Sequence, residues 1–134
     1  MQRPKNEFLE FIELLEGIDR DQRLFPKACR VCGREFSSFP EYVKGTSPRR
    51  HVFEDCREVM GRPFTMMYRH CPCGNTLILT LTDDIVPGLD QLWRMLHREA
   101  EETGRTLREV VGEFGKECDR YMIALVHSRS GTSQ

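Results

Sequence analysis

Two closely spaced pairs of cysteines constrain this sequence more than any other feature. Cys29 and Cys32 form a C-x-x-C pair, and Cys71 and Cys73 form a C-x-C pair. Two thiolates on a tight turn can bind one ion from one side, and two such turns complete the tetrahedron that Zn²⁺ prefers. The sequence therefore predicts one shared metal site, with Zn²⁺ as the ion. Iron fits the same four-sulfur tetrahedron and stays an alternative.

A set of free or redox-active thiols is the other interpretation of these cysteines. We do not expect a disulfide framework, because the start of the chain does not resemble a signal peptide. Acidic residues interrupt its apolar stretch from Phe8 to Leu15. No apolar run approaches the roughly 18 residues that a membrane-spanning helix needs. We therefore expect a cytoplasmic protein.

Strand patterns surround the second cysteine pair. Residues 64–70 and 76–82 are rich in strand-forming residues, and the second run alternates leucine with threonine or isoleucine. The segment 71–75 has turn chemistry, which predicts a β-hairpin with the second cysteine pair at its tip. Residues 37–48 are rich in Ser, Pro and Gly and predict a loop. Residues 49–61 are compatible with either a short strand or a helical turn.

Apolar residues recur at helical spacing near both ends of the chain, over residues 8–18, 89–103 and 107–127. Gly17 and Gly104 are the expected ends of the first two helices. Thr106 and Glu109 match a capping box at the start of the third. The expected fold class is α+β. A small antiparallel sheet with zinc-ribbon-like knuckles packs with one N-terminal and two C-terminal helices.

The length of 134 residues fits a single domain, residues 1–134. Within it we expect an N-terminal helix and linker, a metal-binding β region, a helical hairpin and a flexible tail. Their boundaries are 1–28, 29–87, 88–127 and 128–134.

The two cysteine turns resemble the knuckles of a zinc ribbon. The resemblance rests on Cys29-x-x-Cys32-Gly33 and on Cys71-Pro72-Cys73-Gly74, and it covers residues 29–36 and 64–82. Rubredoxins share this knuckle geometry and bind iron. The second knuckle lacks one residue of the family pattern, and a long insertion separates the two. The resemblance implies a metal ribbon and does not define an activity.

Three further residues are alternative metal ligands: His70, His51 and Cys56. In a strand, His70 would point to the opposite face from Cys71, which disfavours it as a ligand. Cys56 could also be a core residue or a redox thiol. Cys118 falls on the apolar face of the last predicted helix, where we expect a small core residue.

Charge gives a weak indication of partners. The chain has 20 Lys+Arg and 21 Asp+Glu, so its net charge of −1 argues against binding nucleic acid by bulk charge. Residues 29–82 nevertheless carry a small basic excess, and four arginines there form a candidate binding surface: Arg49, Arg50, Arg62 and Arg69. A solvated surface without a nucleic-acid partner is the alternative.

Four thiolates saturate a tetrahedral ion and leave no open position for water, which is typical of a structural site. The sequence contains no serine–histidine–acid set, phosphate loop or paired-carboxylate signature. We therefore predict a non-catalytic, zinc-stabilised binding or regulatory module with a protein partner. One alternative is a redox or electron-transfer protein with a four-cysteine iron site or reactive thiols. Another is an enzyme with a pocket on the sheet face.

The last predicted helix raises the question of oligomeric state. Its apolar face, from Leu107 to Leu125, is longer than a small sheet can cover. We expect a homodimer to cover the remainder. A monomer requires instead that residues of the first helix, such as Phe8 and Ile12, pack on Phe114 and its neighbours.

Overall fold

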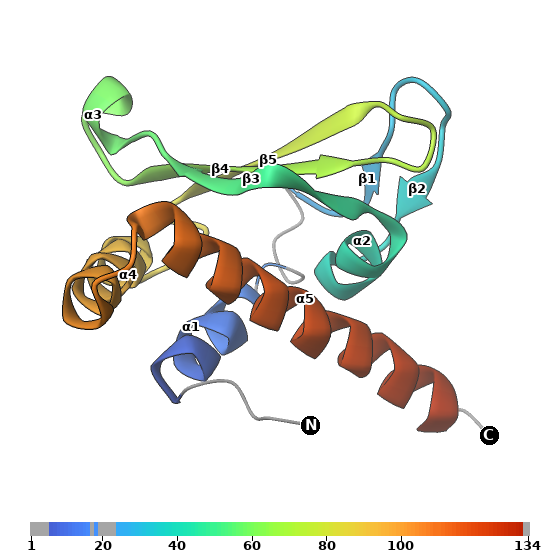
Figure 1. Cartoon of the computed structure of the whole chain (residues 1–134). Helices are drawn as coiled ribbons and strands as arrows, with labels where there is room; N and C mark the ends of the chain where they lie inside the picture. The colour runs from blue at the N-terminus through green and yellow to red at the C-terminus, as the bar shows by residue number, and fades with distance from the viewer. Residues whose placement is uncertain (1–5, 17, 19–23, 133–134) are drawn as a thin grey trace.

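The computed structural model describes residues 6–16, 18 and 24–132. The described elements are α1 (Asn6–Glu16), β1 (Lys27–Ala28), β2 (Glu35–Phe36), α2 (Phe39–Gly45), β3 (Ser47–Asp55), α3 (Arg57–Met60), β4 (Phe64–His70), β5 (Thr76–Thr82), α4 (Leu89–Thr103) and α5 (Leu107–Thr132) (Figure 1). Helices and small antiparallel sheets together confirm the α+β prediction. None of the described helices combines the length and apolar character that crossing a membrane requires.

The main sheet has three antiparallel strands in the order β3-β4-β5, and β1 pairs with β2 in a separate hairpin. The pairing of β4 with β5 is regular, from Phe64 opposite Thr82 to His70 opposite Thr76. Alternation along these strands buries one face, including Met67 on β4 and Leu79 on β5. In Figure 1, α1, α4 and α5 all lie on one side of this sheet. The predicted hairpin is therefore confirmed with its expected boundaries.

The long helix α5 is covered within the chain. The rings of Phe8 on α1 and Phe114 on α5 meet edge to face, with their centroids 5.4 Å apart. Phe53 on β3 contacts the same ring, with centroids 5.9 Å apart, and the Tyr121 hydroxyl donates to Glu16 at 3.1 Å. These are contacts that a monomer requires. The uncovered apolar face that motivated a homodimer is therefore not observed along this part of α5.

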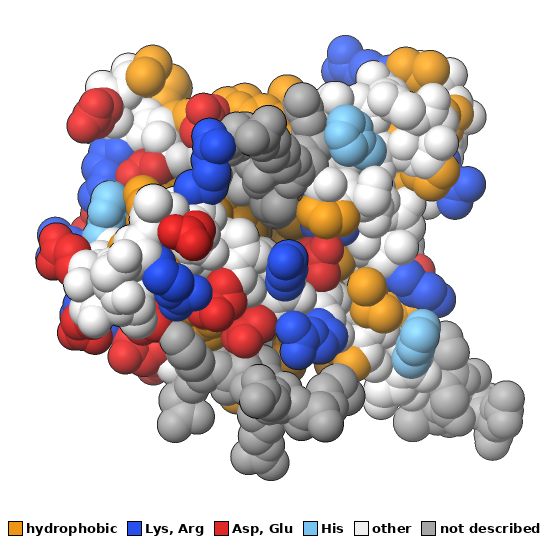
Figure 2. Space-filling view, viewed as in Figure 1, with side chains coloured by type: hydrophobic (Ala, Val, Ile, Leu, Met, Phe, Trp, Pro, Cys, Tyr) orange, Lys and Arg blue, Asp and Glu red, His pale blue; other side chains and the backbone are white. Residues whose placement is uncertain are grey.

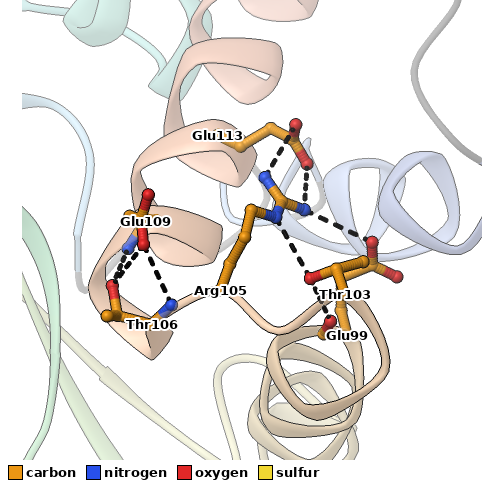
Figure 3. Close-up of polar contacts among 6 residues, drawn as sticks. All are labelled: Glu99, Thr103, Arg105, Thr106, Glu109 and Glu113. Carbon is orange, nitrogen blue, oxygen red and sulfur yellow. Dashed lines mark hydrogen bonds and ion pairs between the residues drawn. The ribbon is translucent and has the colours of Figure 1, made fainter.

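Two sets of polar contacts fix the turn between α4 and α5: a capping box and an arginine bridge (Figure 3). The hydroxyl of Thr106 accepts from the backbone N–H of Glu109 at 3.2 Å, and the Glu109 carboxylate accepts from the backbone N–H of Thr106 at 3.0 Å. The guanidinium of Arg105 bridges Glu99 on α4 to Glu113 on α5. Gly104 ends α4 with φ +70°. The predicted capping box and the Gly104 stop are confirmed.

The loop prediction for residues 37–48 is wrong over most of its length, because α2 occupies 39–45 and β3 begins at Ser47. The Ser38 hydroxyl accepts from the backbone N–H of Glu41 at 3.3 Å, which caps the start of α2. Phe39 and Tyr42 are fully buried. Burial of this apolar face outweighs the turn-forming composition.

Two other boundaries differ from expectation. Residues 49–61 contain both alternatives, with β3 extending to Asp55 and the single turn of α3 over Arg57–Met60. The helix α5 continues to Thr132, beyond its expected end at residue 127. The sequence there lacks a proline, and helical hydrogen bonds can continue through it. Gly17, the expected end of the first helix, lies outside the described residues.

Candidate metal centre

The two cysteine pairs lie at the tips of two hairpins. Cys29 and Cys32 occupy the turn between β1 and β2, and Cys71 and Cys73 occupy the turn between β4 and β5. The four sulfur atoms all lie within 4.8 Å of one another. The fold therefore brings together the four residues that spacing alone had suggested as one ligand set.

Backbone hydrogen bonds shape each knuckle in a similar way. In the first, the N–H of Gly33 donates to the carbonyl of Cys29 at 2.9 Å. In the second, the N–H of Gly74 donates to the carbonyl of Cys71 at 2.8 Å. The two glycines have φ values of +78° and +96°, which residues other than glycine rarely adopt. The C-x-C pair thus forms a closed turn despite being one residue shorter.

The distances between sulfurs fit a single tetrahedral ion. Metal–sulfur bonds of about 2.3 Å place the sulfurs of a tetrahedron about 3.8 Å apart. The Sγ atoms of Cys29 and Cys73 are 3.8 Å apart, and those of Cys32 and Cys71 are 3.6 Å apart. A disulfide needs a separation near 2.05 Å. The donor set therefore fits one shared ion and not a pair of disulfides.

The thiols differ in their surroundings. Cys29 and Cys71 are buried, whereas Cys32 and Cys73 are exposed. The backbone N–H of Cys32 lowers the pKa of the Cys29 thiol to about 6, against the opposing effect of burial, and the side-chain amide of Asn75 assists. For Cys71, the backbone N–H of Cys73 lowers the pKa, but burial and the neighbouring thiols outweigh it and raise the pKa to about 12. A bound ion would favour the thiolate form of all four.

The alternative ligands do not join this cluster in the described part of the chain. His70 ends β4 on the half-buried face that it shares with Tyr68, and the cluster of potential ligand atoms does not include it. Cys56 donates its backbone N–H to Phe64, at the opposite end of β4 from Cys71. The Cys56 thiol lies 3.6 Å from a Glu54 carboxylate oxygen. The side chain of His51 lies outside the described residues.

Cys118 on α5 is fully buried, as expected for a core residue. Burial raises the pKa of its thiol. A thiol that is neither accessible nor ionised is a poor nucleophile. Cys118 is therefore a packing residue.

The candidate arginine surface needs one correction. Arg69 is fully buried and forms a two-pronged ion pair with Asp119, at 3.0 and 3.1 Å, so it cannot belong to an exposed binding surface. Arg62 is exposed, and the side chains of Arg49 and Arg50 lie outside the described residues. On the face drawn in Figure 2, basic side chains are interspersed with acidic ones and do not gather in one patch.

The Asn75 contact and the Arg69–Asp119 ion pair, both at or near the site, were not indicated by the sequence patterns. The Asn75 side chain donates to the sulfur of Cys29 at 3.5 Å and so links one knuckle to the other. Its position directly after Gly74 is a signal that could have found it. Arg69 and Asp119 are distant in sequence, and no local pattern indicates that they pair.

A shallow hollow of about 300 Å³ lies beside the first knuckle, between β2 and α2. Its lining includes Arg34, Glu35, Glu41 and Lys44. Two basic and two acidic residues line it, so it presents no single-sign field to a substrate. The enzyme alternative placed its pocket on the sheet face, whereas this hollow lies elsewhere.

Comparisons with protein-family models, with curated proteins and with solved structures give no match for this chain. The fold and the site together define an α+β protein with a candidate four-cysteine metal centre.

Proposed function

We propose that this protein is a non-catalytic binding or regulatory module stabilised by one Zn²⁺ ion at Cys29, Cys32, Cys71 and Cys73. The convergence of four sulfurs from two hairpins, all within 4.8 Å, carries the proposal. Four thiolates fill a tetrahedral zinc ion and leave no position for a reacting water. The chemistry of the donor set therefore supports a structural role for the ion.

The surface around the first knuckle supports a protein partner. Val31 at its tip is 70% exposed, and the neighbouring Arg30 and Arg34 are also exposed. A turn fixed by a metal ion would present Val31 and the two arginines in one arrangement, so a protein partner could bind them without first ordering the loop. The proposal is of a recognition surface whose shape depends on the ion.

Metal analysis of the purified chain tests the proposal. We expect one zinc per chain, retained through dialysis. Cys32→Ser should reduce the zinc content, whereas Cys56→Ser is the matched control and should leave it unchanged. Cys56 is a suitable control because it lies at the other end of β4. Metal-free protein with an unchanged fold would contradict the proposal.

An iron-binding electron-transfer protein is the second candidate. The exposure of Cys32 and Cys73 favours it, because an iron held there would lie close to solvent and to a redox partner. Iron and zinc accept the same four-sulfur tetrahedron. A coloured protein with stoichiometric iron would select this candidate, and a colourless zinc protein would exclude it.

A further inference from the structure

The strand β5 has one paired and one unpaired edge. It is the outer strand of the β3-β4-β5 sheet, and within the described part of the chain no other strand pairs with its second edge. Ile78, next to the central residue Leu79, is 43% exposed. The edge is independent of the metal centre, which lies at the end of the strand.

The register shows which backbone groups point away from β4. The N–H of Cys71 donates to the carbonyl of Asn75, so these two residues form a hydrogen-bonded pair. Such pairs alternate with non-hydrogen-bonded pairs along an antiparallel ladder. His70 opposite Thr76 and Tyr68 opposite Ile78 are then non-hydrogen-bonded pairs. The N–H and C=O groups of Thr76, Ile78, Thr80 and Thr82 therefore point to the unpaired edge.

Two observed bonds agree with this alternation. The carbonyl of Phe64, which lies opposite Thr82, accepts from Cys56 on the side away from β5. The outward carbonyl of Thr82 accepts from Ile85 and Val86 in the turn that follows. Backbone bonds of the described residues thus account for the Thr82 carbonyl, but they show no partner for the outward groups of Ile78 and Thr80.

The edge lacks the features that keep strands from pairing with other chains. Charged residues, prolines and bulges are the usual protections. The sequence of β5 is Thr-Leu-Ile-Leu-Thr-Leu-Thr, and its register with β4 has no shift. A regular, uncharged edge of this length is competent to accept another strand.

We propose that β5 pairs with β5 of a second copy of this chain, antiparallel, across a two-fold axis at Leu79. In this register Ile78 lies opposite Thr80 in hydrogen-bonded pairs and Leu77 lies opposite Leu81. Thr76 lies opposite Thr82, whose carbonyl is already used within the chain. The leucines stay on the core face, since positions of equal parity share a face. No like charges oppose each other within the strand. The strand carries no charge, and in this register each residue meets a threonine or an aliphatic residue, so the edge is self-complementary, as a two-fold interface requires.

The mass of the full chain in solution gives the first test. Light scattering over a dilution series should give twice 15.7 kDa at high concentration and fall toward 15.7 kDa on dilution. Ile78→Pro removes an N–H that points away from β4 and should abolish the dimer. Ile78→Thr keeps that N–H and is the matched control, which should still dimerise. A mass of 15.7 kDa at every concentration, or a dimer that Ile78→Pro leaves intact, overturns the proposal.

Amide exchange of the unsubstituted protein gives a second test that does not depend on the variants folding. The N–H groups of Ile78 and Thr80 should exchange at least tenfold more slowly at high protein concentration than at low. The N–H groups of Leu77 and Leu79 donate to β4 in either state, and they are the internal control. Concentration-independent exchange at Ile78 and Thr80 overturns the proposal, even if a dimer forms through another surface.

Discussion

Arg69 shows how a single side chain ties the metal-bearing hairpin to the helices. It is the largest of the fully buried side chains in the described residues. Its guanidinium donates to Asp119 on α5 and to the carbonyls of Val43 and Thr46 at the end of α2. Its Nε donates to the Thr46 hydroxyl. The planar, five-donor guanidinium suits this role, and a lysine could not replace it.

Asp119→Ala should destabilise the protein by about 3 kcal/mol, because it leaves the buried charge of Arg69 without its partner. Urea unfolding followed by circular dichroism measures the loss. Asp119→Asn keeps a hydrogen-bond acceptor and should cost less. The control Glu101→Ala replaces an exposed acid on α4 and should change stability by less than about 0.5 kcal/mol. Equal effects of the Asp119→Ala and Glu101→Ala substitutions would contradict this account of Arg69.

Tyr42 carries a buried hydroxyl that has no hydrogen-bond partner among the described residues. Its ring packs edge to face against Phe25 and Phe36. Burial raises the pKa of the phenol from its usual value of 10 to about 12, with Arg69 acting in the opposite direction. The unfolded chain therefore loses this proton at lower pH than the folded protein does. The contribution of Tyr42 to stability is complete below pH 10 and is lost between pH 10 and about 12.

Tyr42→Phe should accordingly flatten the fall in stability above pH 10. Near pH 7 the same substitution should be neutral or slightly stabilising, because it removes a buried polar group that makes no bond. Urea unfolding of both proteins at a series of pH values measures the difference. If the unfolding free energies of the two proteins fell in parallel above pH 10, Tyr42 would ionise in the folded protein as it does in an unfolded chain.

At the scale of elements, local signals were sufficient where pattern and burial agree. The β4–β5 hairpin and the helix α4 follow from period and turn chemistry, and both have the expected boundaries. The helix α2 was missed because its composition is typical of a loop. Its start signal was nevertheless present, since Ser38 and Glu41 have capping-box spacing and Pro40 lies in the first turn.

At the candidate site, too, local sequence signals predicted some residues and missed others. Ligand type and spacing predicted the four cysteines, because a tetrahedral ion needs two close pairs. The Arg69–Asp119 pair could not be predicted, because it depends on how α5 crosses the end of α2. A basic residue in an alternating strand is expected at the surface, and only the tertiary partner makes its burial favourable. The surface role predicted for Arg69 failed for that reason.

Thr106→Ala should destabilise α5 by about 1 kcal/mol, because it removes the cap of the first turn (Figure 3). The backbone N–H and the hydroxyl of Thr106 both lower the pKa of Glu109, and the alanine variant keeps the first of these bonds and loses the second. Thermal unfolding measures the effect. Thr106→Ser keeps the hydroxyl and is the matched control, expected to stay within about 0.5 kcal/mol. A serine variant as unstable as the alanine variant would show that the methyl group, and not the cap, stabilises this turn.

At the scale of the whole molecule, the candidate ion joins two hairpins that the rest of the fold stabilises to different degrees. The β4–β5 hairpin belongs to a three-stranded sheet backed by helices. The β1–β2 hairpin has only two residues in each strand. A hairpin this short is not stable by itself in water. The ion would therefore fix β1 and β2 more than any other elements, while closing the 38-residue loop between Cys32 and Cys71.

Removal of the ion should loosen the first knuckle before the rest of the fold. Closing a loop of this length contributes about 4 kcal/mol, so Cys71→Ser or chelation should lower the melting temperature on the order of 10 °C. Amide exchange should rise first at Gly33, whose N–H closes the first knuckle, and last at Phe114 in the α1–α5 core. Cys56→Ser should melt as the unsubstituted protein does. If chelation left both the melting curve and the exchange of Gly33 unchanged, the four cysteines would not hold a structural ion.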